Sequence, residues 1–314
     1  MLENLIFSLN SVMPFFLLIL LGACFVKIGI APKSFFQTAN SFIFKVALPT
    51  QLFYNVAATT GESMLTGSFM LYSAAVAVAS FFVIWGVTEL IYKDKTIIGT
   101  LVQGAYRGNY ILLGIPLAGM VLGTGAMQAA SVASVVVIPL HNIFSIIVLL
   151  ARGNAKPQSI RGTLKGIALN PLIIGILLAI PVMVLQIRLP EAILRTIMYV
   201  GATGTPLGLL SVGGVLTLAG ATARLGPAIY ASMIKVLLLP AVIMPVSYLL
   251  GFRGEELLIL LMMTATPSAV SSYVMAVEMN GDGPLAANIM ILTTLFSAFI
   301  LAAGIYIMRS LGLI

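Results

Sequence analysis

The sequence predicts an all-α polytopic membrane protein with ten transmembrane helices, arranged as two inverted five-helix repeats in which helices four and nine are broken. Of the 314 residues, 60% are hydrophobic and only 8% are charged, whereas soluble proteins have about 25% charged residues. Apolar stretches of about 20 residues, long enough to cross a hydrocarbon core of about 30 Å, recur along the chain. Two proline-containing segments in corresponding places predict the broken helices.

Each predicted span is an apolar stretch that ends at glycine, proline or charged residues. The spans are residues 5–29, 35–58, 66–92, 96–122, 125–151, 163–186, 192–220, 225–250, 255–280 and 284–309. They divide the chain into a first repeat at 1–151, a short cytoplasmic connection at 152–162 and a second, inverted repeat at 163–314.

The basic residues predict the orientation of these spans. With the amino end outside, the inner connections contain nine Lys and Arg residues and the outer connections contain four. Because short cytoplasmic loops are enriched in Lys and Arg, both termini are expected on the extracytoplasmic side of the cell membrane. The net charge of +7 is spread between apolar runs, so a lipid bilayer is the expected partner and nucleic acid is not.

The residue inventory argues against an enzyme. Cys24 is the only cysteine and His141 the only histidine, so neither a disulfide framework nor a zinc cluster is expected. The sequence contains no Walker pattern, which excludes ATP-driven pumping by this chain alone. It also lacks the paired aspartates on facing spans that would indicate a membrane protease. We therefore expect no enzymatic activity, no cofactor and no metal site.

Two segments share one pattern and predict the internal repeat. Ile115–Ala130 and Pro267–Ala287 each contain a proline, then a Gly-x-Gly turn, then the alanine-rich start of the next span. Pro49 and Pro206 form a second pair, each upstream of one of these segments. Each half has five spans, an odd number, so the two halves enter the membrane in opposite directions.

A proline within a helix removes a backbone hydrogen bond and costs about 3 kcal/mol or more unless neighbouring groups compensate. In hydrocarbon the freed groups need protein or water, so such breaks line cavities. Either proline alone is explained by a simple kink, but two in symmetric positions favour unwound segments whose helix amino ends face one another and suit an anion. The expected breaks include Gly114, Ile115 and Pro116 in span four, and Thr264, Thr266, Pro267 and Ser268 in span nine.

Ionisable residues within the spans are costly and usually face a cavity or a partner. They are Lys45, Glu89, Arg107, His141, Lys235 and Glu278. Arg107 is expected either to attract a substrate or to lie at the interface as a helix cap. Lys235 either neutralises a second carboxylate or forms a charge pair with Glu278. His141 or Glu278 is the candidate carrier of a coupling proton.

Asn109 and Asn142 are neutral amides in spans four and five. An amide donates two hydrogen bonds to a carboxylate without the desolvation cost of a buried cation. The alternative is an amide that only links two helices.

The run Asn109–Pro116 (NYILLGIP) resembles the crossover motif of the auxin efflux carrier family, which includes plant PIN-formed auxin exporters and bacterial malonate and malate permeases. Tyr273–Asn280 (YVMAVEMN) is similar to that family's second crossover helix, and Phe44–Pro49 (FKVALP) also fits. The resemblance covers essentially the whole chain.

The resemblance implies a scaffold domain of helices 1, 2, 6 and 7 and a crossover transport domain of helices 3–5 and 8–10. It implies that Asn109 and Asn142 contact a carboxylate, and that Pro116 and Pro267 are the crossing prolines. The connection after span five is short, so the long regulatory loop of many plant members is absent. Arg107 and Lys235 look more like the bacterial branch, which favours small dicarboxylates. Leu52 stands where plant members tend to have a polar residue.

We therefore expect a secondary active transporter that moves a small organic anion by elevator-type alternating access. The coupling ion is expected to be a proton or sodium, and a homodimer is consistent with this reading. The alternatives are an anion channel and a ligand sensor built on a transporter fold. The expected substrate site consists of Asn109, Asn142, Gly114, Pro116, Thr266, Pro267, Ser268, Arg107 and Lys235.

Overall fold

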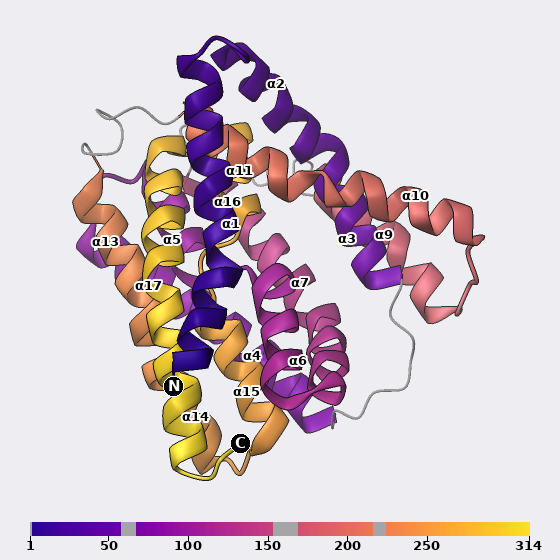
Figure 1. The fold of residues 1–314 in the computed structure, drawn as a ribbon, viewed down its shortest axis with the longest axis vertical. Coiled ribbons are helices and arrows are strands. Elements are labelled where there is room, and N and C mark those ends of the chain that lie inside the picture. The colour runs from indigo at the N-terminus through magenta and orange to yellow at the C-terminus, as the bar shows by residue number, and fades with distance from the viewer. Residues whose placement is uncertain (1, 58–66, 153–168, 216–223) are drawn as a thin grey trace.

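The computed structural model describes residues 2–57, 67–152, 169–215 and 224–314, and these are mostly helical (Figure 1). The helices of the amino-terminal half are α1 (Leu2–Lys27), α2 (Lys33–Phe42), η1 (Ile43–Ala47), α3 (Leu48–Ala57), α4 (Gly67–Ile91), α5 (Ile98–Tyr106), η2 (Tyr110–Gly114), α6 (Ile115–Leu122) and α7 (Thr124–Arg152). Those of the carboxyl-terminal half are α9 (Pro171–Val184), α10 (Glu191–Ala202), α11 (Gly204–Val215), α13 (Leu225–Met233), η3 (Ile234–Leu238), α14 (Leu239–Leu249), α15 (Gly254–Ala265), α16 (Val270–Glu278) and α17 (Gly283–Ser310).

Four helical segments in these ranges are long and apolar enough to cross a membrane. They are Gly67–Ile91, Thr124–Arg152, Leu225–Leu249 and Gly283–Ser310. This confirms a helical protein with membrane-spanning helices. Several other predicted spans are divided into shorter helices, so length and composition alone do not identify them.

Three single turns of π-helix, η1, η2 and η3, each end two residues before a proline, at Pro49, Pro116 and Pro240. In η2 the N–H of Ile115 donates to the carbonyl oxygen of Tyr110, five residues earlier, and the other two turns contain the equivalent bond. Since proline has no N–H to give, the wider turn lets the helix continue past it.

The expected break at Gly114–Pro116 is therefore wrong. The chain is helical from Tyr110 to Leu122, because the π turn accommodates Pro116. The fourth span is broken earlier, at residues 107–109, where Arg107 has extended backbone angles. The second break, from Thr266 to Ala269, does contain Pro267 and Ser268 as predicted, and a proline favours extended backbone in the residue before it.

The two breaks pair with each other. Gly108 and Ser268 form an antiparallel bridge, and the N–H of Asn109 donates to the carbonyl oxygen of Pro267 at 2.6 Å. The N–H of Ser268 donates to Oγ1 of Thr293 in α17 at 3.0 Å. Backbone groups that the breaks release from their helices are thus satisfied within the protein, as a membrane interior requires.

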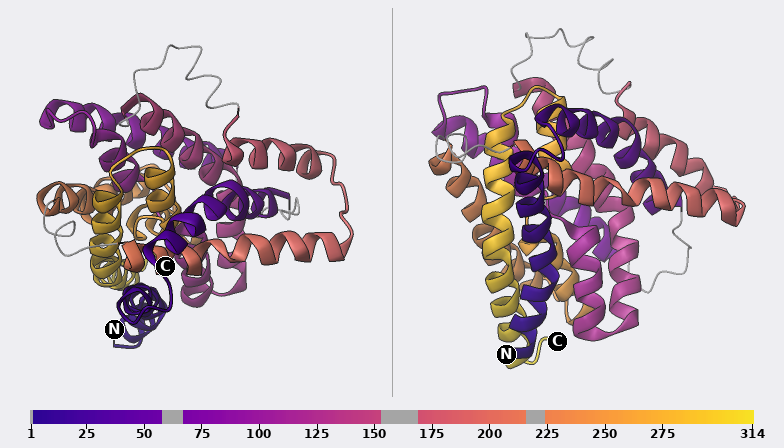
Figure 2. Two further views of the ribbon diagram at one scale, coloured as in Figure 1. Left: turned by 90° about the horizontal axis from the view of Figure 1, so that it is seen from above. Right: turned by 45° about the horizontal axis from the view of Figure 1, so that its top comes forward.

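The helices pack as two groups. The first group has α1 and α2 against α11, and α3 against α9 and α10. Figure 1 shows α3, α9 and α10 together as an arm on the right, and both views of Figure 2 show the same extension. Gly22 and Gly213 allow α1 and α11 to approach closely, since an added Cβ would lie 2.0 Å from the oxygen of Leu210 and 1.7 Å from that of Ile19, respectively.

The second group contains α4–α7 and α13–α17. Here α5 packs on α4 and α7, α6 on α7, α13 on α17, and α14 on α15. Every residue of α5 is buried, and so is every residue of α15 from Leu257 to Ala265. The half-helices that lead into the two breaks therefore form the centre of this group.

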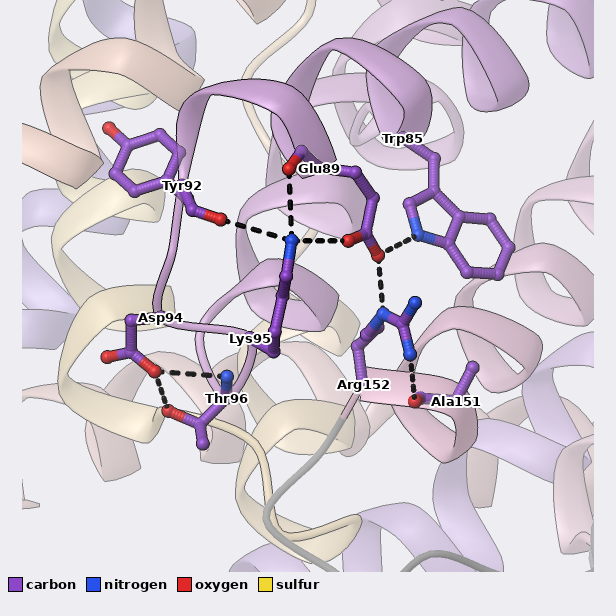
Figure 3. A network of polar contacts seen from close by, with 8 residues as sticks. All are labelled: Trp85, Glu89, Tyr92, Asp94, Lys95, Thr96, Ala151 and Arg152. Atoms are coloured by element: carbon purple, nitrogen blue, oxygen red, sulfur yellow. Dashed lines mark hydrogen bonds and ion pairs between the residues drawn. The ribbon is translucent and has the colours of Figure 1, made fainter.

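A polar cluster closes one end of the second group (Figure 3). The Glu89 carboxylate accepts hydrogen bonds from Nε1 of Trp85, from Lys95 and from Arg152, and so joins α4, the α4–α5 connection and the end of α7. Thr96 donates from its hydroxyl and its N–H to Asp94, and this lowers the pKa of the Asp94 carboxyl group.

Arg224, just before α13, extends the ionic contacts to Asp94 at 3.8 Å and to Asp282 at 3.0 Å. Asp282 also accepts the N–H of Leu285 at 2.9 Å and caps α17. Five elements of the second group are thus connected at one end by charged side chains.

Replacing Gly108 with Ala should destabilise the protein by about 1–3 kcal/mol, the usual cost of overpacking. An added Cβ would lie 2.5 Å from Oγ1 of Thr266 and 3.0 Å from Nζ of Lys235. The measurement is thermal unfolding of the purified protein in detergent. The control is Gly86→Ala in α4, where no atom lies within 4 Å of the new Cβ. A G108A protein as stable as the control would mean that the breaks do not meet so closely.

Glu89→Gln should lower stability by about 1–3 kcal/mol, because two cations lose their carboxylate. The side chain of Glu89 is only 21% exposed. Glu191→Gln is the matched control, since the Glu191–Arg195 pair has side chains 76% and 64% exposed and should contribute about 0–0.5 kcal/mol. Equal thermal unfolding midpoints for the two variants would contradict a structural role for the cluster.

Candidate functional site

A cavity of about 50 Å³ lies at the paired breaks, between the two groups of helices. The first group contributes the α2–η1–α3 segment and the start of α11, and the second contributes the breaks, α7 and α16. The lining residues are Ile43, Leu48, Gln51, Leu52, Gly204 and Thr205 from the first group, and Arg107, Gly108, Asn109, Tyr110, Ile111, Ile138, Asn142, Ala269, Val270, Ser271 and Val274 from the second.

Two helix amino ends face this cavity. The helical segment after the first break begins at Tyr110, and α16 begins at Val270, and both residues line the cavity. The first N–H groups of a helix lack intrahelical acceptors and carry a partial positive charge. Two such ends at one cavity favour a negatively charged ligand.

Arg107 reaches across the cavity wall from the end of α5. Its Nη2 donates to Oδ1 of Asn142 at 2.9 Å and to Oγ of Ser271 at 2.5 Å, and its Nη1 lies 2.8 Å from Sδ of Met275. The residue is buried, with 6% of its surface exposed. Among the described residues no carboxylate forms an ion pair with it. Its positive charge is therefore held by neutral groups, which leaves it able to bind an anion.

The two asparagines have different surroundings. Both polar atoms of the Asn142 amide have partners. Its Nδ2 donates to the carbonyl oxygen of Ile138 at 2.8 Å, and its Oδ1 accepts from Arg107. Asn109 is buried, and its Nδ2 has no hydrogen-bond partner among the residues that the structure describes. A buried amide donor without a partner is costly, so Asn109 lines the cavity with a donor that a carboxylate would satisfy.

The remaining candidates from the sequence do not line the cavity. Pro267 and Ser268 form the pairing of the breaks, and Thr266 packs beside Gly108. Gly114 lies within the helix against the ring of Tyr110, and Pro116 is exposed. Thr266, Pro267 and Ser268 shape the crossing of the half-helices. Gly114 and Pro116 lie beyond it within a continuous helix, so the expectation that Pro116 is a crossing proline is wrong.

Lys235 is completely buried beside the same crossing. Its Nζ donates to the carbonyl oxygens of Thr264 at 2.8 Å, Met263 at 3.2 Å and Tyr106 at 3.5 Å. The charge pair with Glu278 is therefore a wrong expectation, since in the described part of the chain Lys235 contacts backbone oxygens and no carboxylate.

His141 precedes Asn142 but does not line the cavity. Its ring meets the Tyr106 ring edge to face, its carbonyl oxygen accepts from the Tyr106 hydroxyl at 2.5 Å, and its Nδ1 is buried without a partner among the described residues. Glu278 is half-buried at the end of α16.

Several residues at the site were not singled out from the sequence. Ser271 and Met275 lie four positions apart on α16 and hold Arg107, and Gln51 and Thr205 add polar groups from the first group of helices. The repeated prolines Pro49 and Pro206 could have indicated Gln51 and Thr205 from the sequence, because these two residues lie within two positions of the prolines. Within the described ranges no three His, Cys, Asp or Glu side chains gather as metal ligands.

The chain is similar in sequence to known membrane transporters. The chain is 25% identical over 302 residues to an uncharacterized transporter of Methanocaldococcus jannaschii, covering 91% of this chain and 94% of the relative. It is 25% identical over 308 residues to a Rhizobium meliloti protein described as "Putative malonate transporter", covering 95% of each. A family model described as "Membrane transport protein" matches residues 7–305. The chain belongs to this family of membrane transport proteins.

Proposed function

We propose that the chain is a secondary carrier that moves a small carboxylate or dicarboxylate across the cell membrane. One observation carries the proposal: Arg107, the Nδ2 of Asn109, which has no partner among the described residues, and two helix amino ends all lie at one cavity. All of these groups donate hydrogen bonds or carry positive charge, so the cavity suits a carboxylate.

The cavity also favours a short substrate. A volume of about 50 Å³ holds about three to five water molecules at roughly 10–15 Å³ each, which corresponds to an anion of a few carbon atoms. The opposite wall is partly apolar, through Ile43, Leu48 and Leu52, and has polar groups at Gln51 and Thr205. A small dicarboxylate would place one carboxylate at Asn109 and the helix ends and the second at Arg107. The Rhizobium meliloti relative, described as a "Putative malonate transporter", is consistent with this class.

We propose an elevator-type movement for transport. We assign the first group of helices to the scaffold domain and the second to the transport domain, and this assignment is supported by the contacts within each group. The cavity has one wall from each group. Sliding of the second group along the first would therefore expose the bound anion to either side. Ten spans in two inverted repeats, both termini outside and a homodimer belong to the same proposal.

Coupling to a proton through His141 or Glu278, or to sodium, is part of the same proposal. Flux measurements in proteoliposomes test it, because proton coupling requires that a pH gradient alter the rate of anion uptake. Single-channel currents without saturation would indicate the alternative anion channel, and binding without flux would indicate a sensor.

Arg107→Met should weaken binding of malonate by about 10- to 100-fold, since a hydrogen bond to a charged group contributes about 1.5–3 kcal/mol. The fold should persist because Met keeps most of the volume without a buried charge. The measurement is titration of purified protein by calorimetry, with uptake of labelled malonate into proteoliposomes. Arg253→Met, at an exposed arginine between α14 and α15, is the control. Unchanged uptake by R107M would exclude Arg107 from the site.

Asn109→Ala should abolish anion binding and leave the thermal unfolding midpoint near that of the wild type, because Nδ2 of Asn109 has no partner in the described chain to lose. Asn142→Ala should impair both properties, since it removes hydrogen bonds to Arg107 and Ile138. Thermal unfolding with and without malonate separates the two effects. Full binding by N109A, or a wild-type unfolding midpoint for N142A, would contradict these assignments.

A further inference from the structure

Lys235 lies where two helices end. Tyr106 is the last residue of α5, and Met263 and Thr264 belong to the last turn of α15. The Lys235 ammonium donates to a backbone oxygen of each of these three residues. Its side chain comes from a third element, η3, and is completely buried.

The chemistry of this position calls for a cation. The last carbonyl groups of a helix lack intrahelical donors and carry a partial negative charge. Two such ends side by side repel each other in a membrane interior. A lysine ammonium has three N–H donors, which match the three oxygens around it.

The crossing thus has two electrically opposite sides. The carboxyl ends of α5 and α15 meet at Lys235, while the amino ends that follow the breaks meet at the cavity. Only residues 107–109 and 266–269 separate them. Gly108, in the first break, lies next to the Lys235 ammonium, because a Cβ there would lie 3.0 Å from Nζ of Lys235. A change at Lys235 would therefore move the segment that contains Asn109.

We propose that Lys235 is a positioning residue, a built-in cation that holds the two helix carboxyl ends together and so places Asn109 and the helix amino ends for the anion. The part concerning the anion rests on the proposed function. The part concerning the helix ends does not.

The first experiment measures stability without any anion. Lys235→Ala should lower the thermal unfolding midpoint of the purified full chain by about 5 °C or more. Propylammonium, which replaces the deleted side-chain atoms including the charge, should restore most of this loss, and the neutral 1-propanol should not. Lys45→Ala is the matched control, because Lys45 also lies in a π turn before a proline but is exposed. It should show neither loss nor rescue.

Equal rescue by propanol, or no rescue by propylammonium, would overturn the proposal. If K235A cannot be purified, the yield of folded protein from membranes extracted with propylammonium or with propanol gives the same comparison. Recovery with the ammonium alone supports the built-in cation, and recovery with neither overturns it.

The second experiment measures malonate affinity. We expect Lys235→Met, which keeps the length but not the charge, to weaken binding at least tenfold, as Lys235→Ala does, and propylammonium to restore binding by K235A only. Wild-type affinity in K235M would overturn the proposal. If the wild type binds no carboxylate, the proposed function fails, and the stability rescue still decides the role of Lys235.

Discussion

The structure depends on one constraint, that a helix interrupted within a membrane must satisfy its freed backbone groups inside the protein. The two breaks meet this constraint by pairing with each other, through the bridge between Gly108 and Ser268 and the bond from Asn109 to Pro267. Neither break is stable in isolation in hydrocarbon. The pairing therefore fixes the relative position of four half-helices and creates the cavity at their junction.

Two buried cations accompany this junction and are compensated differently. Lys235 is neutralised in effect by helix carboxyl ends, whose partial negative charge is permanent. Arg107 has only the neutral Asn142, Ser271 and Met275 around it. Burial of a cation without a full counter-charge is unfavourable, so the side of the junction with Arg107 gains most from an incoming anion. This asymmetry underlies the proposed division between a structural cation, Lys235, and a ligand-binding cation, Arg107.

The helices within each of the two groups are held together by different interactions. In the first group, glycines such as Gly22 and Gly213 bring backbones into direct contact, which is the usual packing of helices in membranes. In the second, charged side chains around Glu89 and Arg224 connect the helix ends in addition to the apolar core. Each group therefore has its own internal cohesion, which the proposed sliding movement would require.

Composition and periodicity determined the helical membrane class, and the motifs around Asn109 and Pro267 determined the family, because these properties are local in the sequence. The tertiary structure decided where the fourth span breaks. A π turn accommodates Pro116 within the helix, and no pattern in the sequence predicts that turn. It also decided the partner of Lys235, because backbone oxygens exist at every residue and leave no signal in a sequence. Which donors converge on the cavity depends on the pairing of segments about 160 residues apart, and only the folded chain brings them together.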